Sequence, residues 1–362
     1  MIYHLSQYLV GKWGPFRLLQ SHLFLMFVGT FAATVLTMVL LPKLWKHLPH
    51  DHGKAILGKD GMKSAGKPTG AGLLVTLIAL PLLVLFAPLG LWDSLAVAAL
   101  YFAMVFGYLD DRSQKPWGEL KKGMFDLLPS AAIATFLYMG HAEPGGMVMW
   151  MPLSKAVVVV SPYVYIPCAT VLLWFTMNVT NCSDGVDGLA GSLTIIALSM
   201  LAVVLYIVVG YMPVAKYLLI PGNPSAAGWA VVVMTVAGAF AGYLWYNAEP
   251  SKILMGDAGS RFLGILVATA VLVAGNPFLI LAMSPIIIVN GGGGLAKLLL
   301  LRLAKKLGME IGEGAAIRRI RFPLHDHCKK NLGWSNAQVL MRFVLLQILL
   351  MPILLVLFIK IR

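Results

Sequence analysis

Four polar segments of this 362-residue chain carry residue types that bind phosphate or divalent cations, although the chain has only 15 acidic residues. The first segment is GYLDDRSQK, in which Asp110 and Asp111 are adjacent. Adjacent carboxylates repel one another, so such a pair holds a proton or recruits a metal ion or a basic partner. A solvated helix end that only stops membrane insertion would explain the pair equally well. Asp110 and Asp111 are therefore catalytic candidates that need support from other segments.

The second segment is NVTNCSDGVDGLAG, in which Asn178, Asn181, Asp184 and Asp187 recur every three residues. On a regular helix successive members lie about 60° apart around the axis, so that Asn178 and Asn181 share a stripe. The glycines that follow loosen the rest into a loop. An Asp-Gly turn with Asp187 capping the next helix is the alternative. Four polar side chains exceed what a cap requires, and the segment predicts a ligand-binding loop.

The third segment is YNAEPSKILMGDAGS, in which Asn247 ends an apolar run and Asp257 follows Gly256 at the start of the next run. Glycine lets the backbone approach a ligand closely, and a helix N-terminus favours anions. Asp257 is equally well explained as a metal ligand and as a simple N-cap.

The fourth segment is IRRIRFPLHDHCKK, which combines Arg318, Arg319 and Arg321 with His325 and His327. Two histidines flanked by cations can hold a phosphate, shuttle protons or ligate a metal. A basic patch that touches anionic lipid headgroups is the alternative. The histidines favour a site over a purely electrostatic patch.

Composition places these segments in a membrane protein. Apolar residues make up 59% of the chain, charged residues 12%, and the mean hydropathy is +0.83. Runs of about 18 apolar residues predict membrane-spanning helices. Ten are expected, near residues 22–45, 70–90, 92–109, 125–140, 163–179, 189–210, 226–247, 262–275, 277–301 and 338–361. With three scattered cysteines and no internal repeat, we expect an all-α polytopic fold forming one domain over residues 1–362.

The net charge of +13 is mainly a topology signal. Of the 28 basic residues, 20 fall in the odd-numbered loops between the predicted spans. The positive-inside rule then puts these loops in the cytoplasm and both termini outside. The acidic segments share that cytoplasmic side, and we expect no nucleic-acid partner. The loop that holds Asp184 and Asp187 has no Lys or Arg, so another loop or a cation must neutralise it.

In this order, the four segments resemble the polyprenyl-phosphate N-acetylhexosamine-1-phosphate transferases, over roughly residues 60–362. The resemblance implies ten helices, a Mg²⁺-dependent active site open to the cytoplasm, a place in the bacterial plasma membrane and a homodimer. It is strongest to the branch that acts in cell-wall synthesis. The implied reaction is attack of undecaprenyl phosphate on UDP-N-acetylmuramoyl-pentapeptide, a UDP-N-acetylhexosamine derivative, giving lipid I and UMP.

The resemblance also implies roles for single residues. Asp257 matches the Mg²⁺ ligand, and Asp110 and Asp111 match paired catalytic acidic residues, with Asp110 as the base for the lipid phosphate. His325 matches a catalytic histidine, the first of a three-histidine motif whose last member is His327. The substrate-binding residues implied are Asn178, Asn181, Asp184, Asp187, Asn247, Lys122, Thr69 and His327.

Three other functions compete with this interpretation. A sister transferase would use UDP-N-acetylglucosamine on the same lipid. A secondary transporter or flippase would also carry polar groups near helix breaks, but close to the bilayer midplane. A scaffold without catalysis would make the acidic loops incidental. A diphosphate substrate needs a divalent cation and basic residues to offset its charge, and the odd-numbered loops hold carboxylates and basic residues together.

Overall fold

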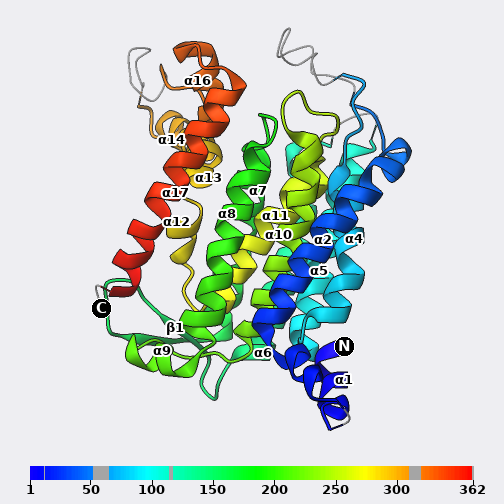
Figure 1. The fold of residues 1–362 in the computed structure, drawn as a ribbon. Coiled ribbons are helices and arrows are strands. Elements are labelled where there is room, and N and C mark those ends of the chain that lie inside the picture. The colour runs from blue at the N-terminus through cyan, green and yellow to red at the C-terminus, as the bar shows by residue number, and fades with distance from the viewer. Residues whose placement is uncertain (12, 52–64, 114–116, 310–318, 361–362) are drawn as a thin grey trace.

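The computed structural model shows a bundle of long apolar helices (Figure 1) and describes residues 1–11, 13–51, 65–113, 117–309 and 319–360. Within these ranges, nine helices are long and apolar enough to cross a membrane. One further apolar helix, α4 (Ala71–Phe86), has 16 residues. At 1.5 Å per residue it is about 24 Å long, shorter than the hydrocarbon core of a bilayer. These ten helices correspond to the ten predicted spans.

The order of the remaining elements follows the predicted alternation of spans and loops. The helices are α1 (Ile2–Leu9), α2 (His22–Leu44), α5 (Leu91–Asp111), α6 (Glu119–His141), α7 (Pro162–Cys182), α8 (Leu189–Val203), α9 (Met212–Tyr217), α10 (Ala226–Asn247), α11 (Gly256–Val273), α12 (Leu279–Met283), α13 (Pro285–Ile287), α14 (Gly293–Lys306), α16 (Leu324–Leu332) and α17 (Asn336–Lys360). Short 3₁₀ helices cover Gly14–Gln20 and Trp45–His47, and π-helical turns cover Val204–Val209 and Ile288–Gly292.

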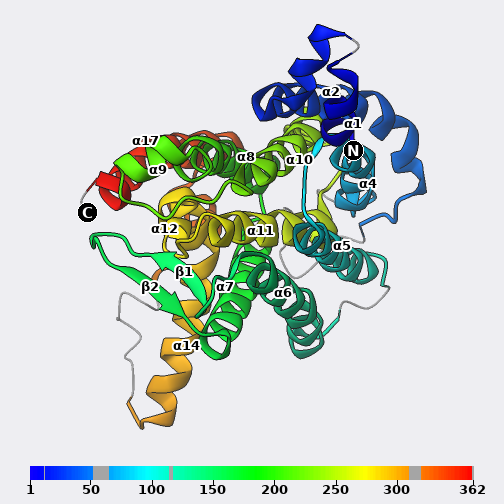
Figure 2. The same ribbon diagram turned by 90° about the horizontal axis from the view of Figure 1, so that it is seen from below.

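Helix α11 runs through the middle of the bundle, between α5, α7 and α8 (Figure 2), and almost all its side chains are buried. Small residues allow this central position. A Cβ on Gly72 of α4 would collide with the Cα of Gly259 in α11, and one on Gly107 of α5 would lie 2.5 Å from the Asp257 carbonyl oxygen. Such close helix crossings are typical of membrane bundles, where packing and not water exclusion holds helices together. They fix the start of α11 against α4 and α5.

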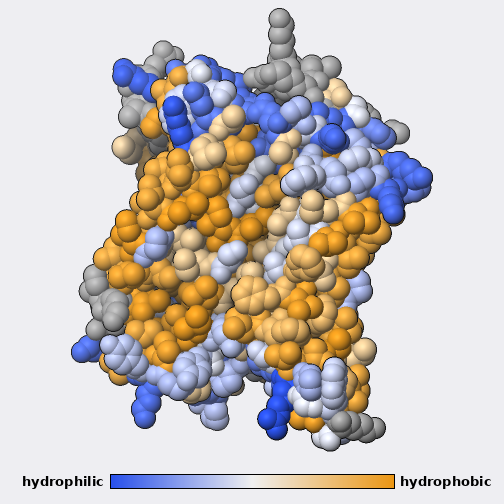
Figure 3. Space-filling view, in the orientation of Figure 1, coloured by the Kyte–Doolittle hydropathy of each residue, from blue (hydrophilic) through white to orange (hydrophobic). Residues whose placement is uncertain are grey.

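The outer helices expose their apolar side chains. Phe27 and Phe31 of α2 and Leu349 of α17 are among the large apolar residues that face outward. On the surface these side chains form a broad hydrophobic belt with hydrophilic residues above and below it (Figure 3). Such a belt, on helices whose outward-facing side chains are also apolar, indicates that lipid surrounds the bundle. The predicted multi-pass membrane fold is confirmed.

The two ends of the bundle differ. One end carries α14 and α16, and the opposite end carries both termini, α9 and a small β-hairpin (Figure 1). The hairpin pairs β1 (Met147–Trp150) with β2 (Val157–Val160) in antiparallel register, with Met147 opposite Val160. Strands were not expected from the sequence. Termini at one end agree with an even number of crossings, while their extracytoplasmic position stays a prediction.

The ninth predicted span differs most from expectation. Four consecutive glycines occupy residues 291–294, and the helix continues through them, with a π-helical turn over Ile288–Gly292. An interruption lies earlier, at Ser284 between α12 and α13. A Cβ on Gly291 would collide with the Val179 carbonyl oxygen of α7. The glycines therefore allow this helix to pack closely against α7, and the π-helical turn keeps its backbone N–H and C=O groups hydrogen-bonded.

Candidate active site

Asp111 holds the first turn of α11. Its Oδ1 accepts a hydrogen bond from the backbone N of Asp257 at 2.9 Å, and its Oδ2 accepts one from Ala258 at 3.0 Å. Carboxylates stabilise helix N-termini because they pair with free N–H groups and the helix dipole. Gly256 begins the helix with a φ of +72°, and a Cβ there would collide with Asp111 Oδ2. The cap of α11 is thus Asp111, and the Asp257 side chain is left for another role.

The Asp257 carboxylate lies between two cations. Lys122 Nζ is 3.2 Å from Asp257 Oδ2 and 2.5 Å from Asp110 Oδ2. Arg261, one turn along α11, donates from Nη2 to the same Asp257 oxygen at 2.9 Å. Its Nη1 is 2.5 Å from Oδ1 of Asp126 in α6. Three carboxylates from three helices are therefore joined through one lysine and one arginine.

Asp110 uses both of its oxygens. Oδ1 accepts a hydrogen bond from the backbone N of Trp117 at 2.8 Å, while Oδ2 contacts Lys122. The residue is buried, whereas the lysine is about a quarter exposed. The flexible side chain of Lys122 therefore lies between solvent and the carboxylates of Asp110 and Asp257.

Asn178 and Asn181 both lie on the last turns of α7, as the spacing predicted. Asn178 donates from Nδ2 to Asp126 Oδ2 at 3.3 Å and to the Trp174 carbonyl oxygen at 2.9 Å. Asn181 lies near the Asp257 carboxylate, but its buried Nδ2 has no hydrogen-bond partner of normal geometry. A buried donor without a partner is costly and favours a ligand at that point.

The loop after α7 is braced by Asn247. Asn247 is buried, accepts a hydrogen bond from the Gly188 N–H at 2.8 Å and donates to the Ile253 carbonyl oxygen at 2.8 Å. The neighbouring Asp187 accepts one from the Ser251 N–H at 3.2 Å. Asp187 does not cap α8, whose N-cap is a glycine without a side-chain cap bond. The oxygen of the Asn247 amide therefore holds the loop after α7, and its nitrogen holds the loop between α10 and α11.

A basic residue from another loop neutralises part of this segment, as expected. Lys67 Nζ lies 4.0 Å from Asp187 Oδ2 and donates to Ser251 Oγ at 3.0 Å. Two residues later, Thr69 is partly buried, and its N–H bonds to the Pro49 carbonyl oxygen at 2.9 Å. Asp184 lies in the same loop and is also partly buried.

His325, in the short helix α16, packs directly against this loop. A Cβ on Gly185 would collide with His325 Nε2, so only glycine permits the contact. The Oδ1 atom of Asn290 accepts a hydrogen bond from the His325 backbone N at 2.8 Å and lies 3.1 Å from Nδ1. Nδ1 must therefore carry the proton. Burial lowers the pKa of His325 to about 4, so its imidazole is neutral at pH 7 and presents a lone pair at Nε2.

His327 lies on the same helix and is less buried. Its Nδ1 accepts a hydrogen bond from the Arg321 N–H at 3.3 Å. Arg319, two residues before Arg321, is exposed, whereas Arg318 falls outside the described residues. The structure thus brings His325 to the acidic loop, while His327 is held by the backbone before α16.

Sequence reasoning missed three buried residues of the site. Arg261 was counted among the loop cations, but α11 begins at Gly256 and places it inside the helix, 3% exposed. Asp126 and Asn290 were given no role. A carboxylate within a predicted span needs a partner, so Asp126 carried a usable signal. The i,i+4 spacing of Asp257 and Arg261 carried another.

The donor set suits an open magnesium site. Among the described residues, no group of three or more His, Cys, Asp or Glu side chains has an arrangement that could enclose a metal ion. Mg²⁺ is commonly bound by one or two carboxylates together with waters and substrate phosphates. Lys122 and Arg261 both contact Oδ2 of Asp257, and neither contact uses Oδ1. The residues fit a cation that arrives with a phosphorylated substrate.

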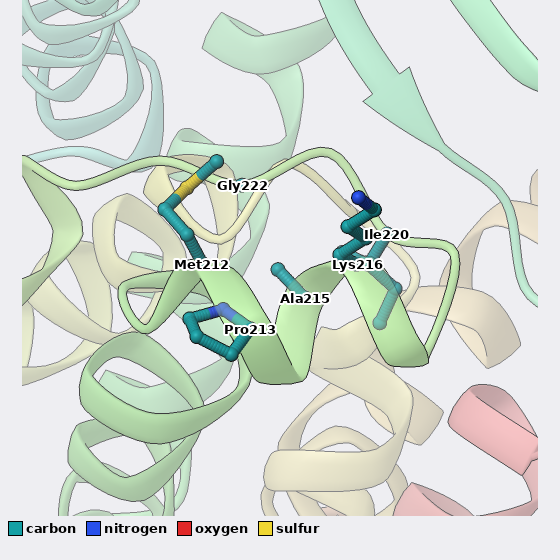
Figure 4. Close-up of a pocket in the computed structure, with 6 residues that line it drawn as sticks. All are labelled: Met212, Pro213, Ala215, Lys216, Ile220 and Gly222. Atoms are coloured by element: carbon teal, nitrogen blue, oxygen red, sulfur yellow. The ribbon is translucent and has the colours of Figure 1, made fainter.

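Two cavities lie at the opposite end of the molecule and do not contain these carboxylates. One, of about 550 Å³, surrounds α9 (Figure 4) and is lined by Met212, Pro213, Ala215, Lys216, Ile220 and Gly222. The other, of about 340 Å³, lies beside His141, whose Nε2 is 2.8 Å from Asp93 Oδ1. Neither has the mixture of carboxylates and fixed cations that a diphosphate needs.

Similarity to known proteins covers nearly the whole chain. Residues 94–275 match the profile of glycosyl transferase family 4. The phospho-N-acetylmuramoyl-pentapeptide-transferase of Treponema pallidum, in each of two strains, is 42% identical over 344 residues, 95% of this chain and 92% of the relative. The protein of that name from Sorangium cellulosum is 30% identical, over 94% of this chain and 92% of the relative. This chain therefore belongs to glycosyl transferase family 4.

Proposed function

We propose that this protein transfers phospho-N-acetylmuramoyl-pentapeptide from its UDP derivative to undecaprenyl phosphate, giving lipid I and UMP for peptidoglycan synthesis. The observation that carries the proposal is the position of Asp257, held by Asp111 and flanked by Lys122 and Arg261 at one end of a membrane bundle. A lipid phosphate and a soluble nucleotide can meet only at such an end. The choice of phospho-N-acetylmuramoyl-pentapeptide as the transferred group is based on the names of the similar proteins.

The protein's residues divide the chemistry among them. Lys122 is placed to leave its carboxylates and contact the substrate diphosphate, because it is the more exposed of the two cations. Asp110 would accept the proton of the lipid phosphate. A Mg²⁺ ion bound through Asp257 would supply charge neutralisation of the leaving phosphate. His325 presents a neutral Nε2 as a hydrogen-bond acceptor beside the loop of Asp184.

Direct attack by the lipid phosphate needs no covalent enzyme intermediate. The lipid phosphate is already an anionic nucleophile, and Asp110 and Asp257 are both engaged by cations. Protein stripped of co-purified lipid should therefore release no stoichiometric burst of UMP from Mg²⁺ and UDP-sugar alone. A lipid-free burst of one UMP per protein, lost in Asp110→Asn, would establish a covalent route.

The cellular setting follows the charge distribution. We place the protein in the bacterial plasma membrane, with the end that carries α16 in the cytoplasm and both termini outside. The resemblance supports a homodimer. Cysteine labelling from each side of the membrane tests the orientation, and cross-linking in native membranes tests the dimer.

The deciding assay is UMP release by purified protein with undecaprenyl phosphate, Mg²⁺ and each candidate nucleotide sugar. UDP-N-acetylmuramoyl-pentapeptide should support turnover, and excess EDTA should abolish it. Turnover with UDP-N-acetylglucosamine alone would assign the protein to the sister activity. Asp257→Asn should lower the rate by orders of magnitude while the protein still folds, and unchanged activity in this variant would refute its role.

A further inference from the structure

The two cations beside Asp257 differ in how firmly they are held. Lys122 is 27% exposed and reaches Asp257 and Asp110 through a flexible side chain. Arg261 is 3% exposed and rises from α11 itself, four residues after Asp257. A lysine can move aside when a ligand enters, because its ammonium group regains water as it moves. The arginine has no such alternative.

A second buried carboxylate fixes Arg261 in place. Asp126 is 1% exposed, contacts Nη1 of the guanidinium at 2.5 Å, and accepts a hydrogen bond from Asn178 Nδ2 at 3.3 Å. The buried Nε of Arg261 has no partner, so the two terminal nitrogens carry the contacts to Asp126 and Asp257. Breaking one partner of a buried ion pair leaves an uncompensated charge, which is strongly destabilising. The chain Asn178–Asp126–Arg261 therefore ties α7 and α6 to α11.

This arrangement has a consequence for any divalent cation. A metal ion that binds Asp257 can displace Lys122 but not Arg261, and it meets a permanent positive charge beside the same carboxylate. Repulsion between charges of the same sign is strong where solvent is excluded. A substrate diphosphate brings several negative charges and reverses this balance.

Resting on the proposed function, we infer that Arg261, anchored by Asp126, is a positioning residue that keeps the metal affinity of the substrate-free site low. The cation then binds tightly only together with the nucleotide diphosphate. Such coupling is reciprocal, so that metal also raises the affinity for the nucleotide. Asp111 keeps the backbone of Asp257 in place independently of the arginine.

The test is Mn²⁺ binding to purified protein, followed by electron paramagnetic resonance with and without the UDP-sugar. The variant Asp126→Asn/Arg261→Leu removes both members of the buried ion pair, so neither is left without the other, and Asp257 and Asp110 keep their contacts to Lys122. Its substrate-free Kd for Mn²⁺ should fall about tenfold, because the nearer of the two removed charges is the positive one. The ratio of the Kd values without and with nucleotide should shrink accordingly. Lys216→Gln, an exposed charge at the opposite end, is the matched control and should leave both Kd values unchanged.

Arg261→Lys keeps the charge and should retain the weak affinity of the substrate-free wild type for Mn²⁺. This variant tests the inference even if the double variant does not fold. A tenfold tighter Kd in Arg261→Lys, or an unchanged or weaker Kd in the folded double variant, would overturn the inference. Failure of the proposed function is seen separately, because wild-type protein would then release no UMP from UDP-N-acetylmuramoyl-pentapeptide and undecaprenyl phosphate, whatever its affinity for Mn²⁺.

Discussion

Replacing His325 by Gln should make the protein less sensitive to acid. In the folded state burial holds the His325 pKa at about 4, whereas a histidine in an unfolded chain titrates near its ordinary pKa of about 6.5. Between these two values the unfolded chain binds more protons than the native state, so stability falls as the pH falls. The stabilising contribution is complete above pH 6.5 and is lost as the pH drops toward 4.

The size of the effect follows from the two pKa values. At pH 5 the linkage costs the wild type about 2 kcal/mol relative to pH 8, because one pKa unit corresponds to about 1.4 kcal/mol. Protonation of Nε2 would place a charge in a buried position where the Asp326 carboxylate, 4.0 Å away, is too distant for a hydrogen bond, so that the cost of burial prevails. His47, whose side chain is exposed, provides the control for the replacement of a histidine by glutamine.

The assay is thermal unfolding in detergent from pH 8 to pH 4.5 for three proteins. Wild type and His47→Gln should lose melting temperature together as the pH falls, and His325→Gln should lose several degrees less while starting from a lower value at pH 8. Parallel curves for wild type and His325→Gln would show that His325 is not held neutral by burial, and would refute the reasoning.

Three further predictions concern the same site. Gly185→Ala should lower the rate by at least about tenfold because its Cβ would collide with His325 Nε2, whereas Gly118→Ala, which meets no atom within 4 Å, should change it little; equal rates would argue against the contact. Asp111→Asn should weaken the cap of α11 and lower both melting temperature and kcat, and an effect on melting temperature alone would separate the cap from catalysis. Asp110→Asn should cost less at alkaline pH, where the lipid phosphate, with a second pKa of about 6, is already ionised; a pH-independent defect in UMP release would favour a positioning role.

The helices were predictable because lipid solvation imposes a long apolar run on each span. The run at residues 226–247 coincides with α10, and that at 163–179 falls within α7. The start of α11 was placed six residues late, because Asp257 and Arg261 lower the local hydropathy although the helix already includes them. The hairpin of β1 and β2 has only four residues per strand, too few to give a pattern distinct from an apolar loop.

The site was predictable in its acidic residues but not in its connections. Asp110 and Asp257 were each identified from local sequence, yet the contact that joins them runs through Lys122 in a third segment. The Arg261–Asp126 pair spans 135 positions, and nothing local indicates that α6 and α11 meet at that level. Likewise, the close approach of Gly291 to the backbone of α7 has no signal in the local sequence.

The depth of the charges distinguishes this end of the bundle from a row of helix caps. Arg261 and Asp126 lie more than one turn inside their helices and are almost fully buried, whereas Lys122 remains partly open to solvent. Buried charges interact strongly and must be balanced in place, while exposed caps need no such partners. A set of carboxylates balanced on its inner side by a fixed arginine and on its outer side by a mobile lysine can exchange only the outer cation. We therefore expect a phosphorylated substrate to enter from the side of Lys122.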